Sequence, residues 1–150
     1  MYNPKIKDSF VMQFGFPSPE PLKKKMYHQW RISQIYVKMR KISQPIIAII
    51  HGAAAGGGFG FAMAADMRIA SEDVKFIHAS INIGLTGADV GGSYFLPRLI
   101  GLSRAAEILS SGRIVDGVVA EKLGWVLQLA EDENFLNVAL VTAVVLLKKS

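Results

Sequence analysis

Three consecutive glycines, Gly56 to Gly58, are the residues of this chain with the clearest chemical potential. They follow an apolar run, Ile46 to Ile50, and precede good helix formers that continue to Asp66. This order predicts a strand, a glycine turn and a helix. The first N–H groups of a helix lack acceptors within the helix and attract negative charge, and glycine lets a ligand approach them closely. The turn therefore suits an oxygen that gains negative charge, such as that of a thioester enolate.

Three alternatives to this interpretation can be weighed from the sequence. The first is a turn that only packs a strand against a helix, and the sequence leaves it open. The second is a dinucleotide fingerprint, which would need glycine where the chain has Phe61. The third, a nucleophile elbow, is excluded because G-x-S-x-G occurs nowhere in the chain. The segments downstream favour the oxyanion-binding turn.

The composition indicates a single globular domain. The chain has 150 residues, of which 51% are hydrophobic, enough to bury a core. It contains no cysteine, which excludes disulfides and cysteine chemistry. The three histidines lack metal-binding spacing, so no metal site is expected. No apolar run reaches the roughly 18 to 20 residues of a membrane span, so no span is expected either.

The charge pattern bears on partners and location. The net charge of +5 favours solubility and a polyanionic ligand such as the phosphates of coenzyme A. The basic run Lys23 to Lys25 is not interleaved with aromatic residues, so no nucleic-acid partner is expected. The first 25 residues lack the continuous apolar core of a secretory signal. We therefore expect a protein that is not secreted, with the cytoplasm, mitochondria and peroxisomes all open as its compartment.

Alternating apolar periodicities predict an α/β layered fold. Four prolines and no sustained period indicate that residues 1–21 form a loop or a disordered leader. Helices are expected at residues 22–42, 57–65, 93–100, 103–110 and 115–123. Strands are expected at residues 46–51, 67–70, 74–77 and 125–129. Ser103 is expected to cap the fourth of these helices, and residues 134–148 are expected to form a mostly apolar helix or strand.

Five blocks of sequence follow one another in a fixed order. They are Q-P-I-I-A-I-I-H-G-A-A-A-G-G-G (44–58), A-A-D-M-R-I-A-S (64–71), G-A-D-V-G-G-S-Y-F-L-P-R-L-I-G (87–101), R-A-A-E-I-L-S-S-G-R (104–113) and A-E-K-L-G-W-V (120–126). In order and spacing, the five blocks together resemble the enoyl-CoA hydratase/isomerase superfamily, also called the crotonase superfamily. The resemblance covers about residues 26 to 130.

The resemblance implies a crotonase-like α/β fold, a spiral of ββα units that is incomplete at both ends. Residues 22–133 would form the partial crotonase-like domain, and residues 134–150 an atypical C-terminal helix. Members of this superfamily usually assemble as trimers and act on acyl-CoA thioesters. The implied partners are therefore an acyl-CoA small molecule and further copies of the chain in a trimer-type homo-oligomer. No bound cofactor is implied, since the coenzyme A thioester is the substrate.

The resemblance also implies where the substrate would bind. Superfamily members hold the thioester oxygen between two backbone N–H groups, and one of them matches Gly57. The other comes from an F-x-A-G-x-D loop that this chain does not contain. Other positions that match substrate-binding segments of the superfamily are Ala53, Ala55, Gly56, Gly58, Ser80 and Gly84.

The acid/base pair of the superfamily has no carboxylate in this chain. Hydratases place one Glu two residues after the glycine triplet and another about twenty residues later, and this chain has Gly60 and Ser80 there. The resemblance to dienoyl-CoA isomerases and aryl-CoA dehalogenases makes Asp89 the expected catalytic base. The alternative is that Asp89 caps the helix expected from Ser93 or bonds loop N–H groups.

These features predict an acyl-CoA-binding protein of lipid or acyl-CoA metabolism that works through a stabilised enolate, as an isomerase or a variant hydro-lyase. The competing hypothesis is a non-catalytic truncated isoform or decayed module that associates with full-length subunits. The glycine turn and Asp89 favour the enzyme, whereas the absent upstream loop favours the module.

Overall fold

The computed structural model describes residues 20–131 and 134–148, and the chain divides into two units, Met1–Ile35 and Tyr36–Ser150. Of the predicted leader, residues 1–19 lie outside the described residues. The described part of the first unit belongs to helix α2 (Glu20–Met39), which begins two residues earlier than the predicted helix. In this helix the rings of Tyr27 and Trp30 stack with their centroids 5.8 Å apart.

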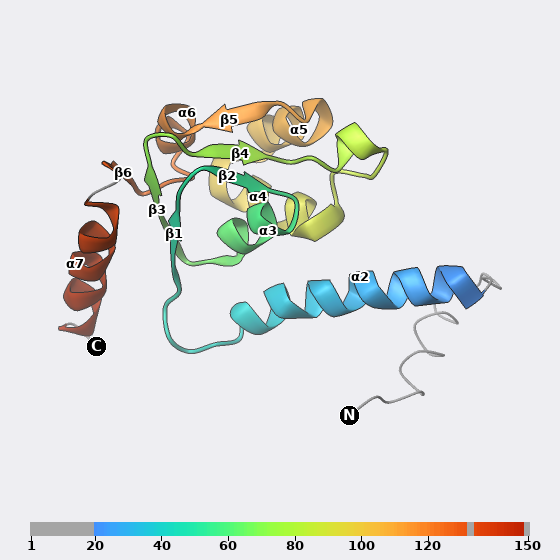
Figure 1. Cartoon of the computed structure of the whole chain (residues 1–150), viewed down its shortest axis with the longest axis horizontal. Coiled ribbons are helices and arrows are strands. Elements are labelled where there is room, and N and C mark those ends of the chain that lie inside the picture. The colour runs from blue at the N-terminus through green and yellow to red at the C-terminus, as the bar shows by residue number, and fades with distance from the viewer. Residues whose placement is uncertain (1–19, 132–133, 149–150) are drawn as a thin grey trace. The chain divides into compact units, whose positions relative to one another are not determined.

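The described residues of the second unit contain two three-stranded sheets (Figure 1). The first sheet is parallel throughout in the order β1-β3-β6, with bounds Ile47–Ile50, Met67–Ser71 and Gln128–Ala130. In the second sheet, β2 runs parallel to β4 and β5 runs antiparallel to β4, with bounds Ala53–Ala55, Lys75–Ile77 and Ile114–Asp116 for β2, β4 and β5. Only His51 and Gly52 separate β1 from β2, so the chain changes sheets just before the glycine turn.

Helices alternate with these strands, as an α/β fold requires. Their bounds are Gly57–Ala64 for α3, Gly92–Ile100 for α4, Leu102–Ser111 for α5, Gly117–Lys122 for α6 and Phe135–Leu147 for α7. Helix α3 contacts β2 and α4, while α7 contacts all three strands of the first sheet (Figure 1). Helix α3, which carries the glycine turn, is therefore supported by the second sheet and by α4.

Three fully buried aromatic side chains hold α3 in place. Phe59 of α3, Phe76 of β4 and Trp125 are each 0% exposed. The ring centroids of Phe76 and Trp125 lie 4.4 Å apart, and Phe59 meets Trp125 edge-on at 5.1 Å. Burying a large aromatic side chain contributes roughly 1.5 to 3 kcal/mol, so this cluster is a major anchor of the helix.

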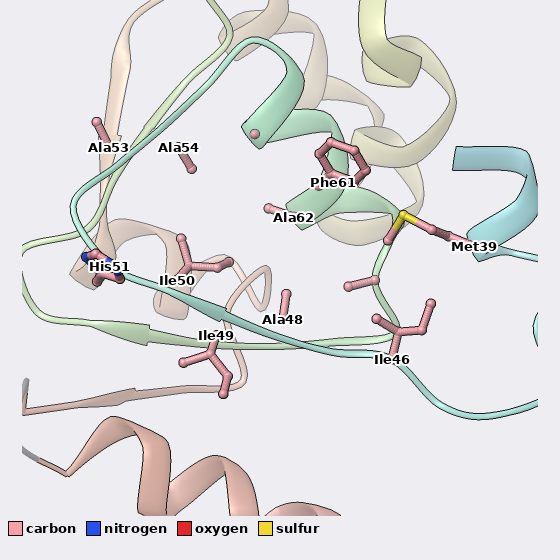
Figure 2. A pocket seen from close by; sticks show the side chains of 12 residues that line it. Met39, Ile46, Ala48, Ile49, Ile50, His51, Ala53, Ala54, Phe61 and Ala62 are labelled. Atoms are coloured by element: carbon pink, nitrogen blue, oxygen red, sulfur yellow. The ribbon is translucent and has the colours of Figure 1, made fainter. Parts of the chain in front are cut away.

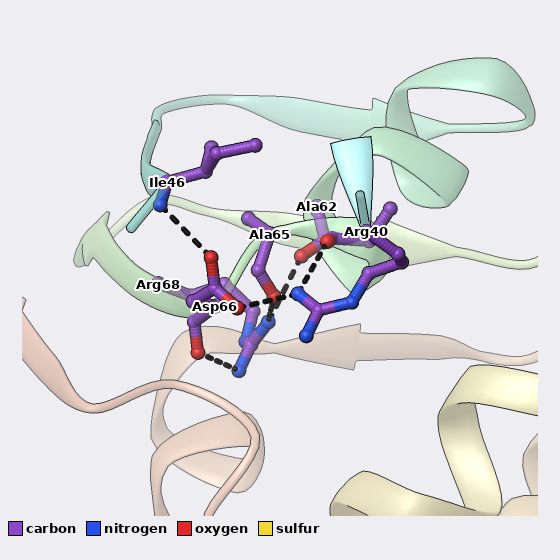
Figure 3. Close-up of polar contacts among 7 residues, drawn as sticks. Arg40, Ile46, Ala62, Ala65, Asp66 and Arg68 are labelled. Carbon is purple, nitrogen blue, oxygen red and sulfur yellow. Dashed lines mark hydrogen bonds and ion pairs between the residues drawn. The ribbon is translucent and has the colours of Figure 1, made fainter. Parts of the chain in front are cut away.

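The junction between α3 and β3 is fixed by a buried guanidinium (Figure 3). Arg68 is 6% exposed and donates hydrogen bonds to four carbonyl oxygens, those of Ala62, Ala65, Asp66 and Trp125. The Asp66 carboxylate accepts from Arg40 at 2.5 Å and from the N–H of Ile46 at 2.9 Å. Partial burial opposes ionisation of Asp66, but these hydrogen bonds outweigh it and lower its pKa. The end of α3 and the start of β1 are thereby tied together.

The structure corrects two predicted features and adds a strand. The helix expected at residues 115–123 is present as the shorter helix α6, because Val115 and Asp116 belong to strand β5. The Asp116 side chain caps the first turn of α6 by accepting from the N–H of Val119. Ser103 caps nothing, because α5 begins one residue before it at Leu102. Residues 53–55, which lie between the predicted strand and the glycine triplet, pair with β4 as strand β2. The apolar final segment, left open as helix or strand, is the helix α7.

Candidate functional site

The glycine turn expected from the sequence is present, because α3 begins at Gly57 directly after β2. Gly56 has φ 50° and ψ −116°, a conformation that residues with a Cβ rarely adopt. Its carbonyl accepts a hydrogen bond from the N–H of Gly60 at 3.0 Å, and no side chain caps the helix. Gly57 and Gly58 are exposed. The first N–H groups of α3 are therefore accessible to an anionic oxygen.

The expected base, Asp89, lies in the loop between β4 and α4, at the start of the 3-10 helix η2 (Asp89–Gly91). The carboxylate is half-buried, and the hydroxyl of Ser80 donates a hydrogen bond to its Oδ2 at 3.4 Å. Ser80 is only 4% exposed, so this donor lies inside the protein. Helix α4 begins after Gly91 without a side-chain cap, so the alternative in which Asp89 caps that helix is wrong.

The residue after Asp89 carries backbone strain. Val90 has φ 48° and ψ 23°, in the left-handed region that β-branched residues avoid at a cost of about 1 to 3 kcal/mol. Its Cβ lies 3.0 Å from the point where a Cβ on Gly60 would stand, and η2 contacts α3. The strained turn thus packs the Asp89 loop against the helix that carries the glycine turn.

Tyr36 lies beside the turn, although the sequence pattern places it only in the apolar stripe of a helix. It is 3% exposed, and its hydroxyl donates to the carbonyl of Gly57 at 3.4 Å. Burial, and after it the negative charge of Asp89, raise the pKa of the Tyr36 hydroxyl, which therefore stays protonated at neutral pH. The one feature of the sequence that could have indicated this position of Tyr36 is Gly60, because glycine is otherwise unfavourable in the middle of a helix.

The remaining predicted binding residues lie on strand β2 and at the two ends of a 3-10 helix. Ala53 and Ala55 are exposed on β2, on either side of the buried Ala54. Gly84 follows the 3-10 helix η1 (Ile81–Ile83) with φ 77°. Ser80 precedes η1, and of this set it is the residue that the structure joins to Asp89 by a hydrogen bond.

An apolar hollow of about 330 Å³ adjoins the turn (Figure 2). Its lining comes from the end of α2, from β1 and β2, and from α3; it includes Met39, Ile46, Ile50, Ala53, Gly58 and Phe61. Two predicted binding residues, Ala53 and Gly58, belong to this lining, but Asp89 and Ser80 do not. The hollow therefore borders the glycine turn without containing the candidate base.

The described residues show no sign of a metal centre. In residues 20–131 and 134–148, no group of three or more His, Asp and Glu side chains is arranged to hold a metal ion. His78 is 1% exposed, and neither ring nitrogen has a hydrogen-bond partner within the described part of the chain. Its ring meets Phe59 edge-on, with centroids 5.3 Å apart, so it packs under α3.

None of the helices in the described ranges has the length and apolarity needed to cross a membrane.

Comparison with known proteins gives consistent matches along most of the chain. The family model described as enoyl-CoA hydratase/isomerase matches residues 19–150. A probable enoyl-CoA hydratase of Mycobacterium tuberculosis is 44% identical over 106 residues, which are 71% of this chain and 37% of that relative. The chain thus spans well under half the length of the curated relative.

Two solved structures extend the comparison to the fold. A probable enoyl-CoA hydratase/isomerase from Mycobacterium abscessus is 39% identical with a TM-score of 0.78, covering 83% of this chain and 47% of that one. A monofunctional enoyl CoA isomerase from M. smegmatis is 40% identical with a TM-score of 0.66, covering 75% of this chain and 52% of that one. The α/β architecture is therefore that of the crotonase fold, present here in part.

Proposed function

This chain belongs to the enoyl-CoA hydratase/isomerase family, and from that premise we propose that it binds an acyl-CoA thioester and shifts a double bond through an enolate. In this proposal the N–H of Gly57 donates to the thioester oxygen, and Asp89 carries the proton. The observation that supports it most is the Ser80–Asp89 hydrogen bond, because it fixes one carboxylate in a loop that packs against the helix of the glycine turn.

The proposed reaction starts from a 3-enoyl thioester. The Asp89 carboxylate removes a proton from the carbon between the carbonyl and the double bond, and the C–H electron pair moves into a dienolate whose charge rests on the thioester oxygen. The Gly57 N–H and the positive end of α3 stabilise that charge. The protonated Asp89 then returns the proton to the far carbon of the former double bond. The carbonyl re-forms, and the product is a 2-enoyl thioester.

One carboxylate is enough for this shift, because the same group takes and returns the proton. Addition of water is faster when one positioned group activates the water and another protonates carbon. Position 60 has no side chain, and Ser80 carries a hydroxyl that does not act as a base near neutral pH. Isomerisation therefore suits the residues present better than hydration does.

The test follows conversion of a 3-enoyl-CoA to the 2-enoyl-CoA, together with exchange of the α-proton in D₂O. Asp89→Asn keeps the shape of the side chain but removes the base, so turnover is expected to fall at least about 10²-fold with little change in Kd. Glu72→Gln is the matched control, since it removes an exposed carboxylate on the turn after β3 and should leave the rate unchanged.

Two results would contradict the proposal. Retention of most of the turnover by Asp89→Asn would make Asp89 structural. Absence of exchange by the unmodified chain would favour the competing hypothesis of a non-catalytic module that associates with full-length subunits. The trimer-type assembly stays a prediction, which light scattering of the purified chain can check.

A further inference from the structure

Gly60 is the point where α3, the last turn of α2 and the Asp89 loop meet. It is buried within α3. A Cβ built on Gly60 would lie 2.7 Å from both Cζ and the hydroxyl oxygen of Tyr36, and 3.0 Å from the Cβ of Val90. Carbon atoms in favourable contact stay about 3.5 to 4 Å apart, so no side chain fits at position 60 unless Tyr36 moves.

The other glycines of α3 do not meet this obstacle. A Cβ on Gly58 would have nothing within 4 Å, and a Cβ on Gly57 would meet only the Tyr36 hydroxyl, at an ordinary 3.8 Å. The restriction at Gly60 therefore comes from the Tyr36 ring and the Val90 side chain. A side chain at position 60 would point toward Val90 and so toward the loop that carries Asp89.

Tyr36 is held over Gly60 from more than one side. Its ring meets the ring of Phe61 edge-on, with centroids 5.3 Å apart, and its hydroxyl donates to the Gly57 carbonyl. Because burial and the charge of Asp89 raise the pKa of this hydroxyl, it is a neutral donor and not a second base at neutral pH. The ring therefore occupies the space beside Gly60 without adding a carboxylate to it.

We propose that Tyr36 is a specificity-determining residue, whose ring fills the space that a side chain at position 60 needs and so limits the site to one carboxylate, Asp89. The chemical consequence rests on the proposed function, whereas the steric part does not. A single carboxylate carries a proton between two carbons, but addition of water gains from a second positioned acid/base group. Tyr36 thereby restricts the site to isomerisation.

The steric part is tested by thermal unfolding of matched glycine variants. Gly58→Ala should raise Tm by up to about 4 °C, because alanine is the better helix former and its Cβ meets nothing. Gly60→Ala should lower Tm by roughly 2 to 8 °C through overpacking against Tyr36.

Combining Gly60→Ala with substitutions at Tyr36 shows whether the Tyr36 ring causes the loss of Tm. In a Tyr36→Ala chain, Gly60→Ala should lower Tm much less, because only the 3.0 Å contact with the Cβ of Val90 remains. In a Tyr36→Phe chain the full loss should persist because the ring remains. Tyr36→Leu, which keeps an apolar side chain, replaces Tyr36→Ala if that variant does not fold. If Gly60→Ala is tolerated as well as Gly58→Ala, or if truncating Tyr36 brings no relief, the inference is overturned, whatever the exchange assay shows for Asp89.

The chemical part is tested with crotonyl-CoA hydration. Gly60→Glu alone should add no hydration, because Tyr36 leaves no room for the carboxylate. The combination of Tyr36→Ala with Gly60→Glu should hydrate crotonyl-CoA at least about tenfold faster than Tyr36→Ala alone. Absence of that gain in a folded double variant would overturn Tyr36 as a specificity determinant. Loss of α-proton exchange in Asp89→Asn tests the proposed function separately, so the two failures are distinguishable.

Discussion

The glycine turn and the Asp89 loop contribute to one candidate site in opposite ways. The turn offers backbone N–H groups, and its shape depends on Gly56, at φ 50°. The loop offers a side chain, and next to it Val90 is held at φ 48°. A backbone donor survives most substitutions unless a side chain fills the space above it. A carboxylate depends on individual neighbours, here Ser80 and Val90. The loop should therefore be the more sensitive half of the site.

The largest expected effect is the absence of hydration by the unmodified chain. The turn offers backbone donors, but Asp89 is the only carboxylate of the loop, and a missing positioned acid/base group costs about 10²- to 10⁴-fold. We expect no hydration of crotonyl-CoA above a blank, measured by loss of the enoyl-thioester absorbance. A rate within about tenfold of an ordinary hydratase would show that one carboxylate is sufficient for hydration. It would contradict the expectation that the loop limits the site more than the turn does.

The next effect in size concerns the turn itself. Gly57→Val puts a branched side chain where the thioester oxygen should lie, and loss of one oxyanion donor typically costs about 2.7 to 4 kcal/mol, or roughly 10²- to 10³-fold in rate. The fold should tolerate the change, because a Cβ on Gly57 makes only an ordinary contact at 3.8 Å. Isomerisation and calorimetric titration with acyl-CoA measure the loss, with circular dichroism as the check on folding. Acyl-CoA binding that survives the change would place the ligand elsewhere.

The two regions also differ in how far the sequence predicts them. The residues that form the turn are adjacent in the sequence: an apolar run is followed closely by Gly56 to Gly58. Local patterns therefore suffice to predict the strand, the turn and the helix. The Ser80–Asp89 bond and the position of Tyr36 over Gly60 depend on tertiary packing, and no local pattern encodes them. The same limit explains why the helix predicted at residues 115–123 starts too early. Its apolar spacing fits a helix throughout, but Val115 and Asp116 pair with β4, and the Asp116 side chain caps α6.

A smaller effect is expected from the contact that holds the loop's carboxylate. Ser80→Ala removes the hydroxyl that donates to Asp89, and a hydrogen bond to a charged group is worth about 1.5 kcal/mol at the low end, or roughly tenfold. The 3.4 Å separation is long, so we expect a loss of about three- to tenfold in kcat with little change in KM. Ser93→Ala, at an exposed position of α4, is the control. An unchanged kcat would show that Asp89 needs no support from Ser80.

The smallest effect tests whether the glycine turn and the Asp89 loop are coupled electrostatically through Tyr36. Burial and then the charge of Asp89 raise the pKa of Tyr36 above its ordinary value of 10.0. An unfolded chain therefore loses this proton at lower pH than the folded one, so the stabilisation is fully present below about pH 10 and is lost as pH rises through the folded pKa. Tyrosinate absorbance, taken as the difference between the unmodified chain and Tyr36→Phe, measures that pKa. Asp89→Asn removes the negative charge and should bring the pKa of Tyr36 back toward 10. A pKa of Tyr36 that does not respond to Asp89→Asn would mean that turn and loop act independently.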